Sequence, residues 1–106
     1  MADKILVTGG SGFIGTNIIE DLISKGYKVL NIDFKEVKII EHKNLWKNID
    51  IRDFKNFHTA VLEFNPNYIL HLAARTDLDG KTMEDYSTNI LGVENLIKIV
   101  KDLPNL

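Results

Sequence analysis

Short apolar runs alternate along the chain with longer stretches in which apolar residues recur every three or four positions. The short runs have the length of strands and cover residues 4–8, 28–33, 45–49 and 68–72. The longer stretches predict amphipathic helices over residues 12–25, 53–64 and 83–103. This alternation implies right-handed crossovers and a parallel sheet. With the first strand central, we expect the strand order 3-2-1-4 with flanking helices, which is half of a doubly wound α/β fold.

Each predicted helix has an apolar face and an end signal. The first helix is expected to end at Gly26, and its inner face to comprise Ile14, Ile18, Ile19, Leu22 and Ile23. Asp53 is expected to cap the second helix, which stops at Asn65-Pro66 and carries a stripe of Phe54, Phe57, Val61 and Phe64. The third helix follows a loose capping box at Thr82 and Asp85 and ends before Pro104, with Tyr86, Ile90, Val93, Ile97 and Val100 on one face. Residues 34–44 fit either a helical turn or a further strand piece.

Composition and charge narrow the function classes. The 106 residues suit one domain, and a net charge of −2 gives no general electrostatic reason to bind nucleic acid. The sequence contains no cysteine, which excludes disulfides and cysteine metal sites, and its three histidines are too scattered to suggest a metal cluster. It also lacks an apolar run long enough to span a membrane and a signal peptide. We therefore expect a cytoplasmic protein that binds no metal, no nucleic acid and no membrane.

A glycine-rich turn directly follows the first predicted strand and opens the first helix. Its glycines Gly9, Gly12 and Gly15 have the spacing of a dinucleotide-binding turn. Gly9 would permit the tight turn, Gly12 would let a pyrophosphate approach the backbone, and Gly15 would let the helix pack on its strand. The N–H groups at the helix N-terminus would then face the phosphates. The turn predicts a bound dinucleotide.

The end of the second predicted strand carries the matching acid. Asp33 lies 18 positions after Gly15, close to the spacing expected for the carboxylate that accepts hydrogen bonds from the adenosine ribose. A carboxylate there would repel a 2′-phosphate, so the sequence favours NAD over NADP. Lys35, two residues further on, could weaken this preference.

Four segments together resemble one enzyme family. The sequence from Thr8 to Gly15 is similar to the signature of the extended short-chain dehydrogenase/reductases, the NAD-dependent epimerase/dehydratase family that acts on nucleotide sugars. Residues 50–53, 71–74 and 89–96 resemble three later family segments, and the resemblance covers residues 4–103. It implies a Rossmann-type site in which Asp50 and Ile51 meet the adenine. The full set of cofactor-binding residues expected is Gly9, Ser11, Gly12, Phe13, Ile14, Gly15, Asp33, Phe34, Asp50, Ile51, Leu72, Ala73, Ala74 and Asn89.

Some of these residues also have plainer explanations. Asp50 also fits a strand-end acid, and His71 fits a strand-end histidine whose ring is hydrogen-bonded. Ala73 and Ala74 fit close packing, cofactor clearance or both. Asn89 is expected to be a buried structural amide that needs hydrogen-bond partners. Arg75 and Thr76, after the fourth strand, are weaker candidates for contact with cofactor or substrate.

The family's catalytic pair is missing from this sequence. Relatives use a tyrosine and a lysine four residues later, with an upstream serine or threonine. Here the residues four positions after Tyr27, Tyr68 and Tyr86 are Asn31, Leu72 and Ile90. We therefore expect no catalytic residue in residues 1–106, which would be the N-terminal NAD-binding portion of a truncated enzyme without its substrate domain. The nucleotide sugar would bind only to a longer parent protein.

This interpretation leaves three functions open. The chain is the cofactor-binding part of an epimerase, dehydratase or reductase, or a non-catalytic NAD-binding module such as a redox sensor, or a fragment that binds nothing tightly because half of the nicotinamide site is absent. Truncation would expose the edge of the fourth strand and part of the last helix. We expect self-association into a homo-oligomer through one of these surfaces.

Overall fold

A parallel sheet forms the centre of the computed structural model, which describes residues 3–73 and 87–106. Within these residues the sheet has four strands in the order β3-β2-β1-β4. The strands are β1 (Lys4–Thr8), β2 (Lys28–Asp33), β3 (Trp46–Asn48) and β4 (Tyr68–His71), and all pairs are parallel. The predicted fold class and strand order are confirmed.

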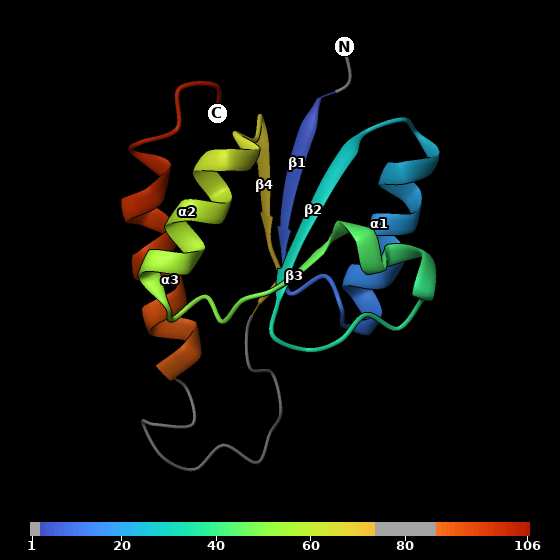
Figure 1. Cartoon of the computed structure of the whole chain (residues 1–106), viewed down its shortest axis with the longest axis horizontal. Helices are drawn as coiled ribbons and strands as arrows, with labels where there is room; N and C mark the ends of the chain where they lie inside the picture. The colour runs from blue at the N-terminus through green and yellow to red at the C-terminus, as the bar shows by residue number, and fades with distance from the viewer. Residues whose placement is uncertain (1–2, 74–86) are drawn as a thin grey trace.

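Helices cover both faces of this sheet (Figure 1). Helix α1 (Phe13–Ser24) lies on one side, and α2 (Phe54–Phe64) and α3 (Ser87–Val100) lie together on the other. The short 3-10 helix η1 (Ile40–Leu45) lies beside α1 and leads into β3. Residues 34–44 thus contain a helical turn, and the third strand is shorter than predicted because Leu45 belongs to that turn.

The core has two parts because successive strand residues point to opposite faces. On the α1 face, Ile5, Val7 and Val29 pack with Ile19. On the other face, the strands and helices bury Leu6, Leu30, Ile32, Ile51, Phe57, Ala60, Val61, Ile99 and Leu103. This second cluster fixes α2 and α3 against the sheet.

The end signals of the helices behave as the sequence predicts. Gly26 has φ +89° after α1, and Asn65 has φ +52° after α2. The Asp53 side chain accepts a hydrogen bond from the Asn56 N–H and so caps α2. The capping residues predicted for the third helix, Thr82 and Asp85, lie outside the described residues.

All three predicted helix faces are partly wrong. On α2 the predicted stripe is buried at Phe57 and Val61, but Phe54 in the first turn is exposed. On α1, Ile14 and Ile23 are exposed, because Gly15, Thr16 and Ile19 form the side that contacts the turn and sheet. On α3, the predicted stripe is largely exposed at Ile90, Val93 and Ile97, whereas Gly92, Asn95 and Ile99 are buried. Apolar residues occur on both sides of this helix, so periodicity alone did not identify the side that packs.

Candidate functional site

The glycine-rich turn lies at the carboxyl ends of the strands, where open α/β sheets bind their ligands. Thr8, the last residue of β1, is paired with Ile32 of β2 and His71 of β4. The turn therefore begins between the ends of two neighbouring strands and leads directly into α1 (Figure 1). Asn31 and Asp33 of β2 and the residues that follow β4 contact the turn there.

Two glycines of the turn are required by the protein's own packing. At Gly9, with φ +73°, a Cβ would lie 2.6 Å from the backbone nitrogen of Ala73. At Gly15, a Cβ would lie 2.6 Å from Gly10 Cα and 2.7 Å from the Gly9 oxygen. These distances are too short for any side chain. The tight turn predicted at Gly9 is therefore present, whereas Gly15 packs against the turn residues Gly9 and Gly10 and not, as predicted, against the strand.

Gly12 is different, because nothing in the described chain crowds it. Its backbone is extended, with φ −76° and ψ 178°, and the nearest atom to a built Cβ is the Gly9 oxygen at 3.8 Å. Gly12 is also the N-cap of α1 and supplies no side-chain hydrogen bond, so the first N–H groups of the helix have no acceptor within it. The space above Gly12 and these donors together suit an anionic group from outside the chain.

Two large apolar side chains flank this opening. Phe13 is 78% exposed and Ile14 is 65% exposed, although both begin a helix whose other face is packed. Ser11, by contrast, is buried under the turn. The exposed pair gives the opening an apolar border beside its backbone donors.

Polar side chains at the end of β2 hold the turn in place. Asn31 is fully buried; its Oδ1 accepts from the Gly10 N–H at 2.8 Å and its Nδ2 donates to Ser11 Oγ at 3.1 Å. Asp33 accepts from the Ser11 N–H at 3.1 Å and from the Lys35 N–H at 3.0 Å, one bond to each carboxylate oxygen. Each oxygen has a further lone pair, so the carboxylate retains acceptor capacity.

Sequence reasoning missed two residues beside Asp33. Asn31 could have been noticed as a polar residue inside an otherwise apolar strand. Trp46, the only tryptophan of the chain, donates from Nε1 to the Asp33 carbonyl oxygen at 2.7 Å. No sequence spacing indicates that contact. Phe34, which the resemblance assigns to the site, is exposed next to Asp33.

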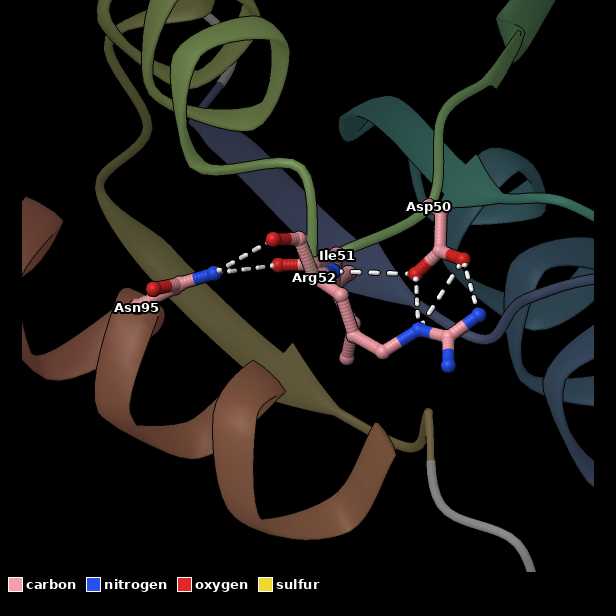
Figure 2. A network of polar contacts seen from close by, with 4 residues as sticks. All are labelled: Asp50, Ile51, Arg52 and Asn95. Atoms are coloured by element: carbon pink, nitrogen blue, oxygen red, sulfur yellow. Dashed lines mark hydrogen bonds and ion pairs between the residues drawn. The ribbon is translucent and has the colours of Figure 1, made fainter. Parts of the chain in front are cut away.

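The loop after β3 carries a second acid with a fixed partner (Figure 2). Arg52 donates to Asp50 from its backbone nitrogen at 2.9 Å and from Nη2 at 2.7 Å, and its Nε contacts both carboxylate oxygens. The hydrogen bonds from the Arg52 side chain hold the pKa of Asp50 below its ordinary value. Ile51 is buried between them and the core.

Helix α3 holds this loop from below through Asn95, another residue that sequence reasoning missed. Its Nδ2 donates to the carbonyl oxygens of Ile51, at 2.9 Å, and Arg52, at 3.2 Å. No local pattern in the sequence marks Asn95 as buried or identifies the carbonyls that its amide meets. Figure 2 shows the Asn95 side chain directed at the loop backbone.

The end of β4 closes the site beside Gly9. His71 Nδ1 lies 2.6 Å from Thr8 Oγ1, which also accepts from the Ala73 N–H at 3.4 Å. Burial lowers the pKa of His71 and so favours its neutral form. His71 is thus a histidine with a satisfied ring nitrogen. Leu72 and Ala73 are half-buried, and each packs against one of the two core clusters. The other predicted residues, Ala74, Arg75, Thr76 and the side chain of Asn89, lie outside the described part of the chain.

The part of the chain that the structure describes offers neither a membrane-spanning helix nor a metal-binding cluster. In residues 3–73 and 87–106, no helix is long and apolar enough to cross a membrane. The same residues contain no group of three or more His, Asp or Glu side chains placed to hold a metal ion.

Comparison with known proteins places these features in a family. The sequence model described as the NAD dependent epimerase/dehydratase family matches residues 5–105. A probable dTDP-glucose 4,6-dehydratase of Sinorhizobium fredii is 31% identical over 110 residues, which cover 92% of this chain and 31% of that protein. A 3-beta-hydroxysteroid dehydrogenase of Mycolicibacterium neoaurum is 34% identical, covering 89% of this chain and 27% of that protein.

A solved structure agrees with the sequence relatives. The Thermus thermophilus UDP-glucose 4-epimerase in complex with NAD superposes with a TM-score of 0.83 at 32% identity. The match covers 94% of this chain and 34% of that structure. The chain therefore spans about a third of the length of the relatives that it matches.

Proposed function

The chain belongs to the NAD dependent epimerase/dehydratase family, and on that premise we propose that its glycine-turn site binds NAD. The observation that carries the proposal is Gly12, the turn glycine whose missing side chain faces open space rather than the protein. A pyrophosphate that approaches the backbone requires this space, and the first N–H groups of α1 supply the donors. The residues present therefore fit the cofactor.

Asp33 explains the choice of NAD over NADP in this proposal. Its carboxylate is fixed by two backbone N–H groups and retains acceptor capacity for the two hydroxyls of the adenosine ribose. A 2′-phosphate in the same place would face a buried negative charge, which is unfavourable. Lys35, whose backbone rather than ammonium contacts Asp33, offers little compensation.

The other residues of the site extend it along the sheet. The resemblance to the family implies that Asp50 and Ile51 meet the adenine, and both lie at the same end of the sheet as Asp33. Leu72 and Ala73 would border the pyrophosphate and nicotinamide ribose beside Gly9, together with Ala74. Ser11, Phe13, Ile14 and Phe34 complete the lining, and Asn89 would support it from α3.

The reaction we propose is that of a nucleotide-sugar epimerase or dehydratase, for which bound NAD would supply the acceptor of a hydride from a sugar carbon. Within this chain no tyrosine is followed by lysine at the required spacing, so residues 1–106 provide cofactor binding and no catalytic residue. That observation favours a second candidate, a non-catalytic NAD-binding module. The relatives are about three times as long, which favours the enzyme as the whole protein.

Assembly and location complete the proposal. Ile90, Leu91, Val93 and Ile97 form an exposed apolar face on α3, which we propose as the contact of a homo-oligomer. A molar mass of one chain in light scattering at high concentration would contradict this assembly.

We propose a cytoplasmic location, where a diffusible dinucleotide is available.

Substitution of Gly12 by serine tests the proposal, because the affinity for NAD should fall while the melting temperature does not. Serine is a favourable N-cap residue and the structure has room for it, so the melting temperature should stay constant or rise. Its side chain would occupy the phosphate space and the helix donors, so calorimetric affinity for NAD should fall about tenfold or more.

The matched control for this test is Gly26→Ala, at a glycine that lies outside the site and also has open space around it. It should leave the affinity unchanged. If Gly12→Ser binds NAD as well as the unaltered protein, the phosphate does not lie over Gly12 and the proposed site is wrong.

A further inference from the structure

We propose that Asn95 is a positioning residue that holds the loop 50–52 so that the site selects an adenine base. This inference rests on the proposed NAD site and deepens it. Asn95 lies on α3, outside the glycine turn (Figure 2). We expect it to contact neither the phosphates nor the ribose. It would act through the backbone of the loop.

The Asn95 side chain is hydrogen-bonded to the backbone of the loop. Only 8% of the residue is exposed, and its single Nδ2 group donates to two successive carbonyl oxygens, those of Ile51 and Arg52. An amide nitrogen has two protons, so both are used. Two successive peptide units are thereby held in one orientation.

The same helix also fixes the position of the loop by close packing. Gly92 lies three residues before Asn95, on the same side of α3. A Cβ at Gly92 would overlap Ile51 Cδ1, so the absence of a side chain there lets Ile51 sit directly against the helix. Ile51 is 3% exposed. Residues 92 and 95 together determine where the loop lies.

The loop in turn determines where the Asp50 carboxylate points. Arg52 donates hydrogen bonds to Asp50 from its backbone nitrogen and from its guanidinium. A rotation of the 51–52 peptides would therefore move both the guanidinium and the carboxylate. An ionised carboxylate only accepts hydrogen bonds. It would bind the exocyclic amine of adenine and repel the carbonyl oxygen that hypoxanthine carries in the same position.

The experiment compares NAD with nicotinamide hypoxanthine dinucleotide, which differs from it only in the base. Binding can be followed by fluorescence of Trp46, the sole tryptophan, which contacts Asp33. The unaltered protein should prefer NAD by about tenfold, the worth of one good hydrogen bond to a charged group. In Asn95→Asp, whose carboxylate cannot donate to the two carbonyls, this ratio should fall below about threefold.

Two variants make the comparison decisive. Asn44→Asp adds the same charge at an exposed residue of η1 and should keep the tenfold preference. Asn95→Ser keeps one donor with a smaller side chain. If Asn95→Asp does not fold, the serine variant should show an intermediate ratio.

The possible results distinguish the role inferred for Asn95 from the proposed binding of NAD. A lower melting temperature with an unchanged base preference would show that Asn95 is only structural and would overturn the inference. Equal binding of both dinucleotides by the unaltered protein would also overturn it, while leaving the NAD site intact. Failure of the unaltered protein to bind either dinucleotide would overturn both.

Discussion

Glycines of the turn between β1 and α1 differ in what requires them. Gly9 and Gly15 have backbone atoms of other residues where a side chain would lie, whereas Gly12 faces open space. Gly9 and Gly15 are therefore needed for the stability of the fold, whereas we expect Gly12 to be needed for ligand binding. Substitution at each position should separate these two properties.

Gly15→Ala should destabilise the protein by about 2–3 kcal/mol, since its methyl group would overlap the backbone of Gly9 and Gly10. Gly26→Ala is the matched control, with a positive φ but no neighbouring atom within 4 Å, and should cost about 1 kcal/mol. Urea unfolding measures both. Equal free energies of unfolding for the two variants would contradict the close packing at Gly15.

Asp33→Asn should reduce the preference for NAD over NADP by about tenfold, because it removes the negative charge that disfavours a 2′-phosphate. Asp21→Asn, at an exposed acid of α1 that pairs with Lys25, alters the net charge equally and should leave the preference unchanged. Calorimetric titration with each cofactor gives the ratio. A preference that survives in Asp33→Asn would assign the selectivity to another group.

His71 should make stability depend on pH. Burial lowers the pKa of His71 in the folded protein, so the unfolded state takes up a proton first as the pH falls below about 6.5. The free energy of unfolding should therefore decrease from that pH down to the folded pKa and then level off. His71→Gln should remove this part of the slope in urea unfolding between about pH 7 and 5. If the free energy of unfolding depends on pH equally in both proteins, His71 is not the source of this pH dependence.

At the scale of elements, the sheet was predictable and one helix face was not. The four strand runs are separated by helical stretches, and parallel strands with right-handed connections leave few arrangements. The apolar positions of α3, however, surround most of the helix. The packed side follows from Gly92 and Asn95 meeting the loop 50–52, a contact between distant segments.

In the site, too, contacts between distant segments could not be predicted from the sequence. The glycine spacing and Asp33 could be located from local patterns, and the structure places them together. Asn31, Trp46 and Asn95 act through contacts across 13 to 44 residues of sequence, which no local spacing reveals. Their roles required the fold.

Two isoleucines of α3 test which face is buried. Ile99 is fully buried in the core shared with α2, so Ile99→Ala should lower the free energy of unfolding by about 2–4 kcal/mol. Ile97 is 55% exposed, and Ile97→Ala should change it by less than about 0.5 kcal/mol. Dilute protein keeps self-association out of the measurement. A larger effect at Ile97 would mean that the helix is rotated.

The whole molecule brings four separate segments to one end of its sheet. The turn before α1, the end of β2, the loop 50–52 and the end of β4 converge there (Figure 1). This is the edge at which a doubly wound sheet binds its cofactor. The family match and the NAD-bound epimerase structure agree with this arrangement over about a third of an enzyme's length.

The most direct test of NAD binding at this end of the sheet is a titration of the isotope-labelled protein with NAD, followed by backbone amide NMR shifts. We expect the largest saturable shifts at residues 12–15, with smaller ones at Asp33 and residues 50–52, and weaker changes with NADP. Absent shifts, or shifts confined to the polar groove between β3 and α2 lined by Lys47 and Glu63, would contradict the NAD site.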